Sequence, residues 1–193
     1  SVQYSRFLIC LGNIIVADQG GDTGGEDTEF RVYDMHRPGP HSVVSFGDIG
    51  AQRWDRVSFT IAPADADTMA ANATDADVEL MQTNGYSVYA EGTATNGTDT
   101  FTFAWGFDTD TTYGECHHDD FGEGVVVPDG GVESAEITIH GDHLFYDDLQ
   151  SEDTVLRFNA MAAADADSDG DVTLDELALI DLTTLTEGTY GTG

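Results

Sequence analysis

The sequence predicts a mostly β protein, an antiparallel β-sandwich with a short C-terminal EF-hand-like loop and helix. Short runs in which apolar and polar residues alternate, separated by Gly/Asp clusters, predict the sandwich. An acidic loop at residues 165–176, followed by helical spacing, predicts the appendage. A chain of 193 residues suits one domain with a core. We therefore expect a β-sandwich domain over residues 1–150, and a calcium-loop and helix appendage with a tail, packed on it, over 151–193.

Alternating apolar residues define the expected strands. The run TFTFAWGF at 100–107 places its aromatic residues on one face, and residues 86–95 form a second run before it. Asn-Gly at 96–97 tolerates the positive φ of a tight turn, which predicts a hairpin between the two runs. Other predicted elements are strands over 6–16, 56–61 and 135–139 and a short helix within 67–81.

The charge restricts the choice of partners. The chain has 37 acidic residues against 6 basic ones, all of them Arg, and a formal net charge of −31. Such a surface repels nucleic acid and anionic membranes, whereas it attracts cations. No run approaches the roughly 18 apolar residues of a membrane span. The dispersed carboxylates are typical of a solvated surface in a salt- or calcium-rich exterior. No signal peptide is visible at Ser1, which fits either a cytoplasmic protein or a mature, processed one.

The two cysteines bear on the compartment. Cys10 lies in a predicted strand and Cys116 lies in the polar stretch YGECHHDDF. Such a pair predicts a disulfide in an exported protein, which we expect to be extracellular, on the cell surface or periplasmic. Two reduced thiols, one buried and one reactive, are the alternative. A disulfide would prevent Cys116 from serving as a thiolate ligand. The NAT and NGT motifs at Asn72 and Asn96 are glycan acceptors if the host glycosylates.

The strongest functional motif is DADSDGDVTLDE at 165–176. It matches the calcium loop of an EF-hand, in which Gly170 permits the turn at position six and Val172 is the apolar residue at position eight. Calcium prefers six to eight oxygen ligands, which this order wraps around one ion. An acidic surface loop is the alternative interpretation. The predicted calcium ligands are Asp165, Asp167, Asp169, the carbonyl of Asp171, Thr173 through a water, and a bidentate Glu176.

Histidines offer a second kind of metal site. His36 and His41 form one close pair in HRPGPH, and His140 and His143 form another in HGDH. Two such pairs brought together would hold copper or zinc. The alternative is that each histidine is a solvated or capping group in a turn. On a straight strand His140 and His143 would face opposite ways, but a bend at Gly141 would let both point to one side.

Five segments in this order resemble secreted or lipid-anchored bacterial proteins related to the MbnP-like, methanobactin-associated copper-protein family. The segments are TIAPADADT, GYSVYAEGTAT, FAWGFDTDTTYGEC, ITIHGDHLFYDDL and LRFNAMAAADADSDGDVTLDEL. The resemblance covers about residues 54–182. The resemblance implies an extracytoplasmic β-sandwich, copper binding, and a partner haem protein that oxidises a tryptophan. It makes His140 and His143 the preferred copper ligands, and the calcium loop marks a subset of such proteins.

Three functions follow from these patterns. No nucleophile–base arrangement, Walker loop or HExxH motif occurs, so we expect no enzyme. The favoured function is an extracellular calcium-binding module with a structural or binding role. The second is a self-assembling surface or fibre subunit stabilised by calcium, in which a terminal strand pairs with a neighbouring copy. The third is a periplasmic copper-binding protein that uses a histidine cluster and a redox partner.

Overall fold

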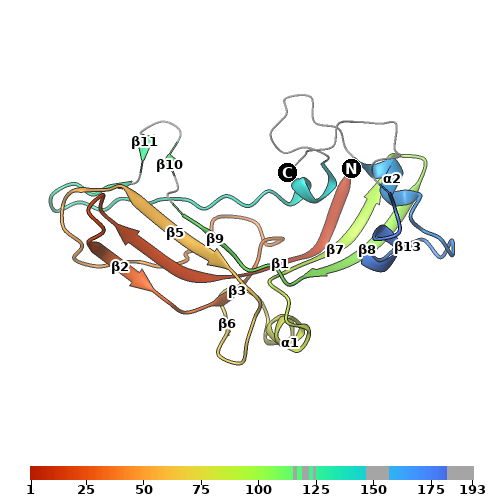
Figure 1. The fold of residues 1–193 in the computed structure, drawn as a ribbon, viewed down its shortest axis with the longest axis horizontal. Coiled ribbons are helices and arrows are strands. Elements are labelled where there is room, and N and C mark those ends of the chain that lie inside the picture. The colour runs from red at the N-terminus through yellow and green to blue at the C-terminus, as the bar shows by residue number, and fades with distance from the viewer. Residues whose placement is uncertain (115–116, 119–121, 124, 147–156, 182–193) are drawn as a thin grey trace. The chain divides into compact units, whose positions relative to one another are not determined.

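The structure is a computed structural model that describes residues 1–114, 117–118, 122–123, 125–146 and 157–181 (Figure 1). Strands predominate in this part of the chain, and the helices are short. The predicted mostly β fold with a short C-terminal loop and helix is confirmed. None of the described helices is long and apolar enough to cross a membrane.

The chain forms two compact units. The first unit comprises Ser1–Phe7, Ala90–Trp105 and Ile139–Gly193, and the second comprises Leu8–Tyr89 and Gly106–Thr138. The predicted domain boundary between residues 150 and 151 lies outside the described residues, as does the whole predicted tail, TEGTYGTG at 186–193.

The predicted N-terminal strand is confirmed as part of β1 (Val2–Ala17), which pairs antiparallel with three strands of the second unit. The core of this unit includes Leu8, Cys10, Val32 and Met81. The bounds of the partners are β2 (Thr23–Asp27), β3 (Arg31–Asp34) and β5 (Arg56–Ile61). Shorter strands are β4 (Arg53–Trp54), β6 (Met69–Ala70), β9 (Thr111–Tyr113), β10 (His117–His118), β11 (Gly122–Glu123) and β12 (Val125–Val126).

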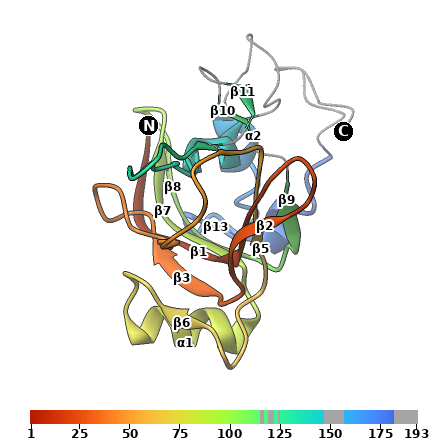
Figure 2. The ribbon, with the colours of Figure 1, turned by 90° about the vertical axis from the view of Figure 1, so that its left-hand side faces the viewer.

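The expected short helix is α1 (Asp75–Asn84), which lies beside β6 in Figures 1 and 2. Thr74 caps its N-terminus through a hydrogen bond from the Asp77 amide, and the Asp77 carboxylate accepts from the Thr74 amide in return. Gly85 ends the helix at φ 65°, a left-handed conformation that glycine adopts without steric cost. Local capping therefore defines both ends of this helix.

The predicted hairpin is confirmed as β7 (Val88–Thr95) and β8 (Thr100–Phe107). Its residues 90–105 belong to the first unit, and the outer ends of the two strands belong to the second. The aromatic face of β8 is buried, with Phe101, Phe103 and Trp105 at most 2% exposed. Phe145 packs on this face, its ring centroid 5.5 Å from that of Phe103 and 5.6 Å from that of Trp105. The remaining elements of the first unit are η1 (Gly141–Phe145, a 3₁₀ helix), α2 (Phe158–Ala162), β13 (Asp171–Val172) and α3 (Leu174–Leu177).

Two sequence expectations are corrected. The predicted strand over 135–139 is wrong, because residues 131–140 form no regular secondary structure and only Ile137 and Ile139 among them are half-buried. Alternation alone does not make a strand where no neighbouring strand supplies the hydrogen bonds. The sheet is also mixed, since β13 pairs with β8, and β3 with β6, in parallel.

Candidate metal sites

The acidic loop brings its first three predicted ligands together. The loop follows α2 and continues through β13 into α3, all in the first unit (Figure 1). One carboxylate oxygen from each of Asp165, Asp167 and Asp169 lies within 4.8 Å of the others. Hard oxygens at this spacing are the ligands that calcium prefers. The convergence predicted for positions one, three and five is therefore present.

Local backbone geometry produces this convergence. Ser168 at φ 62° and Gly170 at φ 85° adopt the left-handed conformation, so the chain reverses sharply between positions four and six. The amides of Asp169 and Gly170 donate to the two carboxylate oxygens of Asp165 at 3.1 and 3.0 Å. The Asp171 amide donates to Asp169 Oδ1 at 2.8 Å. These bonds hold the carboxylates on the inside of the turn.

Glu176 occupies a capping position. Its Oε2 accepts hydrogen bonds from the amide and the hydroxyl of Thr173, both at 2.9 Å, and its Oε1 accepts from the Ala166 amide at 3.1 Å. The hydrogen bonds from the Thr173 amide and hydroxyl are the main reason why the pKa of Glu176 is lowered. The converging group of three carboxylates does not include Glu176. Each oxygen of an ionised carboxylate has two lone pairs, so these bonds leave acceptor sites for an ion.

The second half of the loop pairs with the β8 strand. Asp171 pairs with Thr102 and Val172 with Phe103 in parallel register. Val172 is fully buried, and its carbonyl oxygen accepts a 2.8 Å hydrogen bond from the Trp105 indole. The apolar residue at position eight thus anchors the loop in the aromatic core of the first unit.

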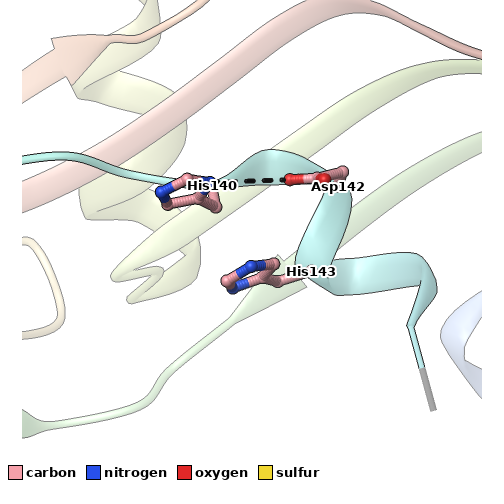
Figure 3. A group of neighbouring side chains, drawn as sticks. All are labelled: His140, Asp142 and His143. Atoms are coloured by element: carbon pink, nitrogen blue, oxygen red, sulfur yellow. Dashed lines mark ion pairs between the residues drawn. The ribbon is translucent and has the colours of Figure 1, made fainter. Parts of the chain in front are cut away.

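The HGDH segment forms a second cluster, shown in Figure 3. His140, Asp142 and His143 each offer a ligand atom within 4.8 Å of the others, and all three side chains are exposed. The imidazole rings stack with centroids 4.8 Å apart and planes 11° from parallel. His140 Nδ1 lies 4.0 Å from Asp142 Oδ1. An imidazole pair with a carboxylate is a donor set suited to zinc or copper.

A 3₁₀ turn explains how two histidines three residues apart face the same way. η1 starts at Gly141 with His140 as its N-cap, and the His143 amide donates to the His140 carbonyl at 3.3 Å, which closes a turn of the 3₁₀ kind between the two histidines. The Tyr4 hydroxyl donates to the Gly141 carbonyl, and a Cβ at Gly141 would lie 2.9 Å from Phe7 Cε1. The predicted bend at Gly141 is therefore present, and close packing against β1 requires glycine there.

His36 and His41 form no such cluster. Among the described residues, no group of three metal-ligating side chains includes either of them. The His36 amide donates to Asp34 Oδ1, and His41 Nε2 lies 3.1 Å from the Arg37 carbonyl oxygen. His36 thus lies in a turn and His41 lies near the Arg37 carbonyl, and their role as metal ligands stays a prediction.

Cys10 is fully buried, and burial raises the pKa of its thiol to about 11. A thiol in this state is a poor nucleophile at neutral pH. Cys10 is a free thiol in the structure, so the predicted disulfide to Cys116 is not formed there; Cys116 itself lies outside the described residues.

Sequence reasoning missed three residues near these sites. Asp142 stands between the two histidines, and the HGDH motif itself was the available signal. The sequence pattern places Thr102 and Trp105 only in a predicted strand, and no local pattern links them to a loop about 70 residues later.

Comparison with protein-family models, curated proteins and solved structures finds no match for the chain.

Proposed function

We propose that this chain is an extracellular calcium-binding β protein in which one ion fastens the C-terminal loop to the β8 strand. Its role is structural or binding rather than enzymatic. The observation that carries the proposal is the convergence of the Asp165, Asp167 and Asp169 carboxylates in a loop with the EF-hand ligand order. The net charge of −31 favours cations as partners and disfavours nucleic acid.

A calcium sensor transmits its signal by opening a pair of helices when calcium binds. A single loop of this kind more often stabilises a structure. Here α2 and α3 are each about one turn long. The buried Val172 and its bond to Trp105 support a structural role, since they connect the ion-binding residues to the core. We expect a dissociation constant of about 10⁻⁴ to 10⁻³ M, the range of extracellular calcium modules.

Isothermal titration calorimetry with calcium tests the proposal. The wild type binds one calcium ion, and Glu176→Gln weakens binding by at least about tenfold, because a neutral amide replaces the closing carboxylate. Gln still caps α3, so the helix is retained. Asp175→Asn is the matched control, since it removes the same charge from the adjacent exposed residue, which is not a ligand position. Absence of binding by the wild type, or equal affinities for the two variants, would contradict the proposal.

A transition-metal function is the second candidate, because His140, Asp142 and His143 converge. Three exposed donors leave coordination positions open, as in sites where a substrate, a water or a partner supplies further ligands. The family resemblance in the sequence favours copper at His140 and His143. Titration with Cu²⁺ and Zn²⁺ tests this candidate. His143→Gln should weaken binding at least about tenfold, whereas His41→Gln, a histidine outside the cluster, should leave the affinity unchanged.

A further inference from the structure

Three consecutive loop residues each form a hydrogen bond to β8. The Thr102 amide donates to the Gly170 carbonyl at 2.9 Å, and the Thr102 hydroxyl donates to Asp171 Oδ1 at 2.8 Å. The Trp105 indole donates to the Val172 carbonyl at 2.8 Å. Positions six, seven and eight of the loop are therefore all attached to one strand of the first unit.

This attachment fixes the position of the one backbone carbonyl that the loop offers to the ion. Position seven supplies its carbonyl to the ion, and here that residue is Asp171. The carbonyls on both sides of it, of Gly170 and Val172, are held by β8 donors. The Asp171 carboxylate, which is not part of the converging group, is held by Thr102. The peptide that must face the ion is thus fixed by its neighbours and by its own side chain.

Holding the loop in place lowers the free-energy cost of binding calcium. Ordering a loop around an ion costs conformational entropy, and a loop that is already ordered loses less of it. We propose that Thr102 is a positioning residue of the calcium site, which pre-orders the Gly170–Val172 half of the loop through the Asp171 side chain, with Trp105 as the second anchor. The inference rests on the proposed function, because it concerns the affinity of the same loop.

A purely structural role for Thr102 makes a different prediction. The bond between the Thr102 hydroxyl and Asp171 is exposed, and a structural bond would change the stability of the calcium-free protein without changing affinity. A positioning role changes the affinity itself. The two roles are separated by measuring the calcium dissociation constant and, in EGTA, the melting temperature of the same variants.

The test is calorimetric titration with calcium of wild type, Thr102→Val, Thr102→Ser and Thr100→Val. Valine keeps the β-branched shape but removes the hydroxyl, and serine keeps the hydroxyl. Thr100 is the matched control, because it is an exposed β8 threonine whose hydroxyl bonds to Thr95 Oγ1 instead of the loop. We expect Thr102→Val to raise the dissociation constant about fivefold, the effect of one hydrogen bond. Thr102→Ser and Thr100→Val should match the wild type.

The outcomes are distinguishable. Wild-type binding with equal affinity in Thr102→Val would overturn the positioning role while the calcium function stands. An equal loss of affinity in Thr100→Val would also overturn it, since the effect would then belong to the strand and not to the contact with Asp171. A wild type that binds no calcium would overturn the proposed function itself.

Discussion

The Trp105 indole N–H donates a 2.8 Å hydrogen bond to the Val172 carbonyl oxygen, and both residues are at most 1% exposed. This bond connects a core residue of β8 directly to position eight of the acidic loop. The indole is therefore an intrinsic reporter of the loop, and its environment should change when calcium orders the residues around Val172.

Tryptophan fluorescence checks this relationship. Calcium should shift or strengthen the emission of Trp105, and EGTA should reverse the change. The chain has one other tryptophan, Trp54, whose indole donates to the Gly50 carbonyl in the second unit. We therefore expect the response to persist in Trp54→Phe and to disappear in Trp105→Phe. A response that follows Trp54 instead would contradict the connection between β8 and the loop.

Removing the buried side chain of Val172 should destabilise the protein. Val172→Ala deletes two methyl groups from a fully buried site, and we expect a loss of about 2 kcal/mol in the free energy of unfolding. Val132→Ala is the control, because Val132 is 93% exposed and its truncation should change little. Urea denaturation with calcium present measures both. Equal stabilities would mean that the loop is not packed on β8.

Glu176 should make the stability of the calcium-free protein depend on pH. Hydrogen bonds from the Thr173 amide and hydroxyl are the main cause that lowers the pKa of Glu176 in the folded protein. The ionised Glu176 carboxylate therefore stabilises the fold in full at any pH above its ordinary pKa of 4.5. That stability is lost as pH falls through the lowered pKa. In EGTA, the stability difference between wild type and Glu176→Gln should therefore shrink between neutral pH and about pH 3. A difference that is constant or grows in acid would contradict the assigned bonds.

Salt should stabilise the calcium-free protein. With 37 acidic and 6 basic residues, the folded chain repels itself, and the Debye length falls from about 10 Å at 0.1 M salt to about 3 Å at 1 M. The melting temperature in EGTA should rise steadily with sodium chloride concentration. A melting temperature independent of salt would show that the carboxylates are too far apart to interact.

Local sequence patterns predict the features of the fold that depend on residues close together in the sequence. The aromatic alternation over 100–107 gave β8, Asn96-Gly97 gave the hairpin turn, and the Asp spacing gave the convergence at Asp165. The parallel pairing of β13 with β8 joins distant segments, so no local pattern carries it. The strand predicted over 135–139 failed for a related reason, since alternation does not specify a pairing partner.

The histidine cluster shows the same limit. The HGDH motif predicts a bend at Gly141, but the residues that contact the bend, Tyr4 and Phe7, lie near the N-terminus. Their packing places the 3₁₀ turn on β1, and the turn aligns His140 with His143. A sequence motif can thus name the donors, while the fold determines which side they face.

The most direct test of the central claim is the thermal melt of wild-type protein in calcium chloride, in magnesium chloride at equal ionic strength, and in EGTA, with light scattering. At about 100 times the dissociation constant, calcium should stabilise the protein by about 2.7 kcal/mol, which raises the melting temperature by roughly 5–10 °C. Magnesium, which demands a stricter octahedral geometry, should have a smaller effect. Large particles that dissolve in EGTA would favour the calcium-dependent fibre subunit. Identical melts in all three buffers would contradict the account, because a bound ion must stabilise the fold that binds it.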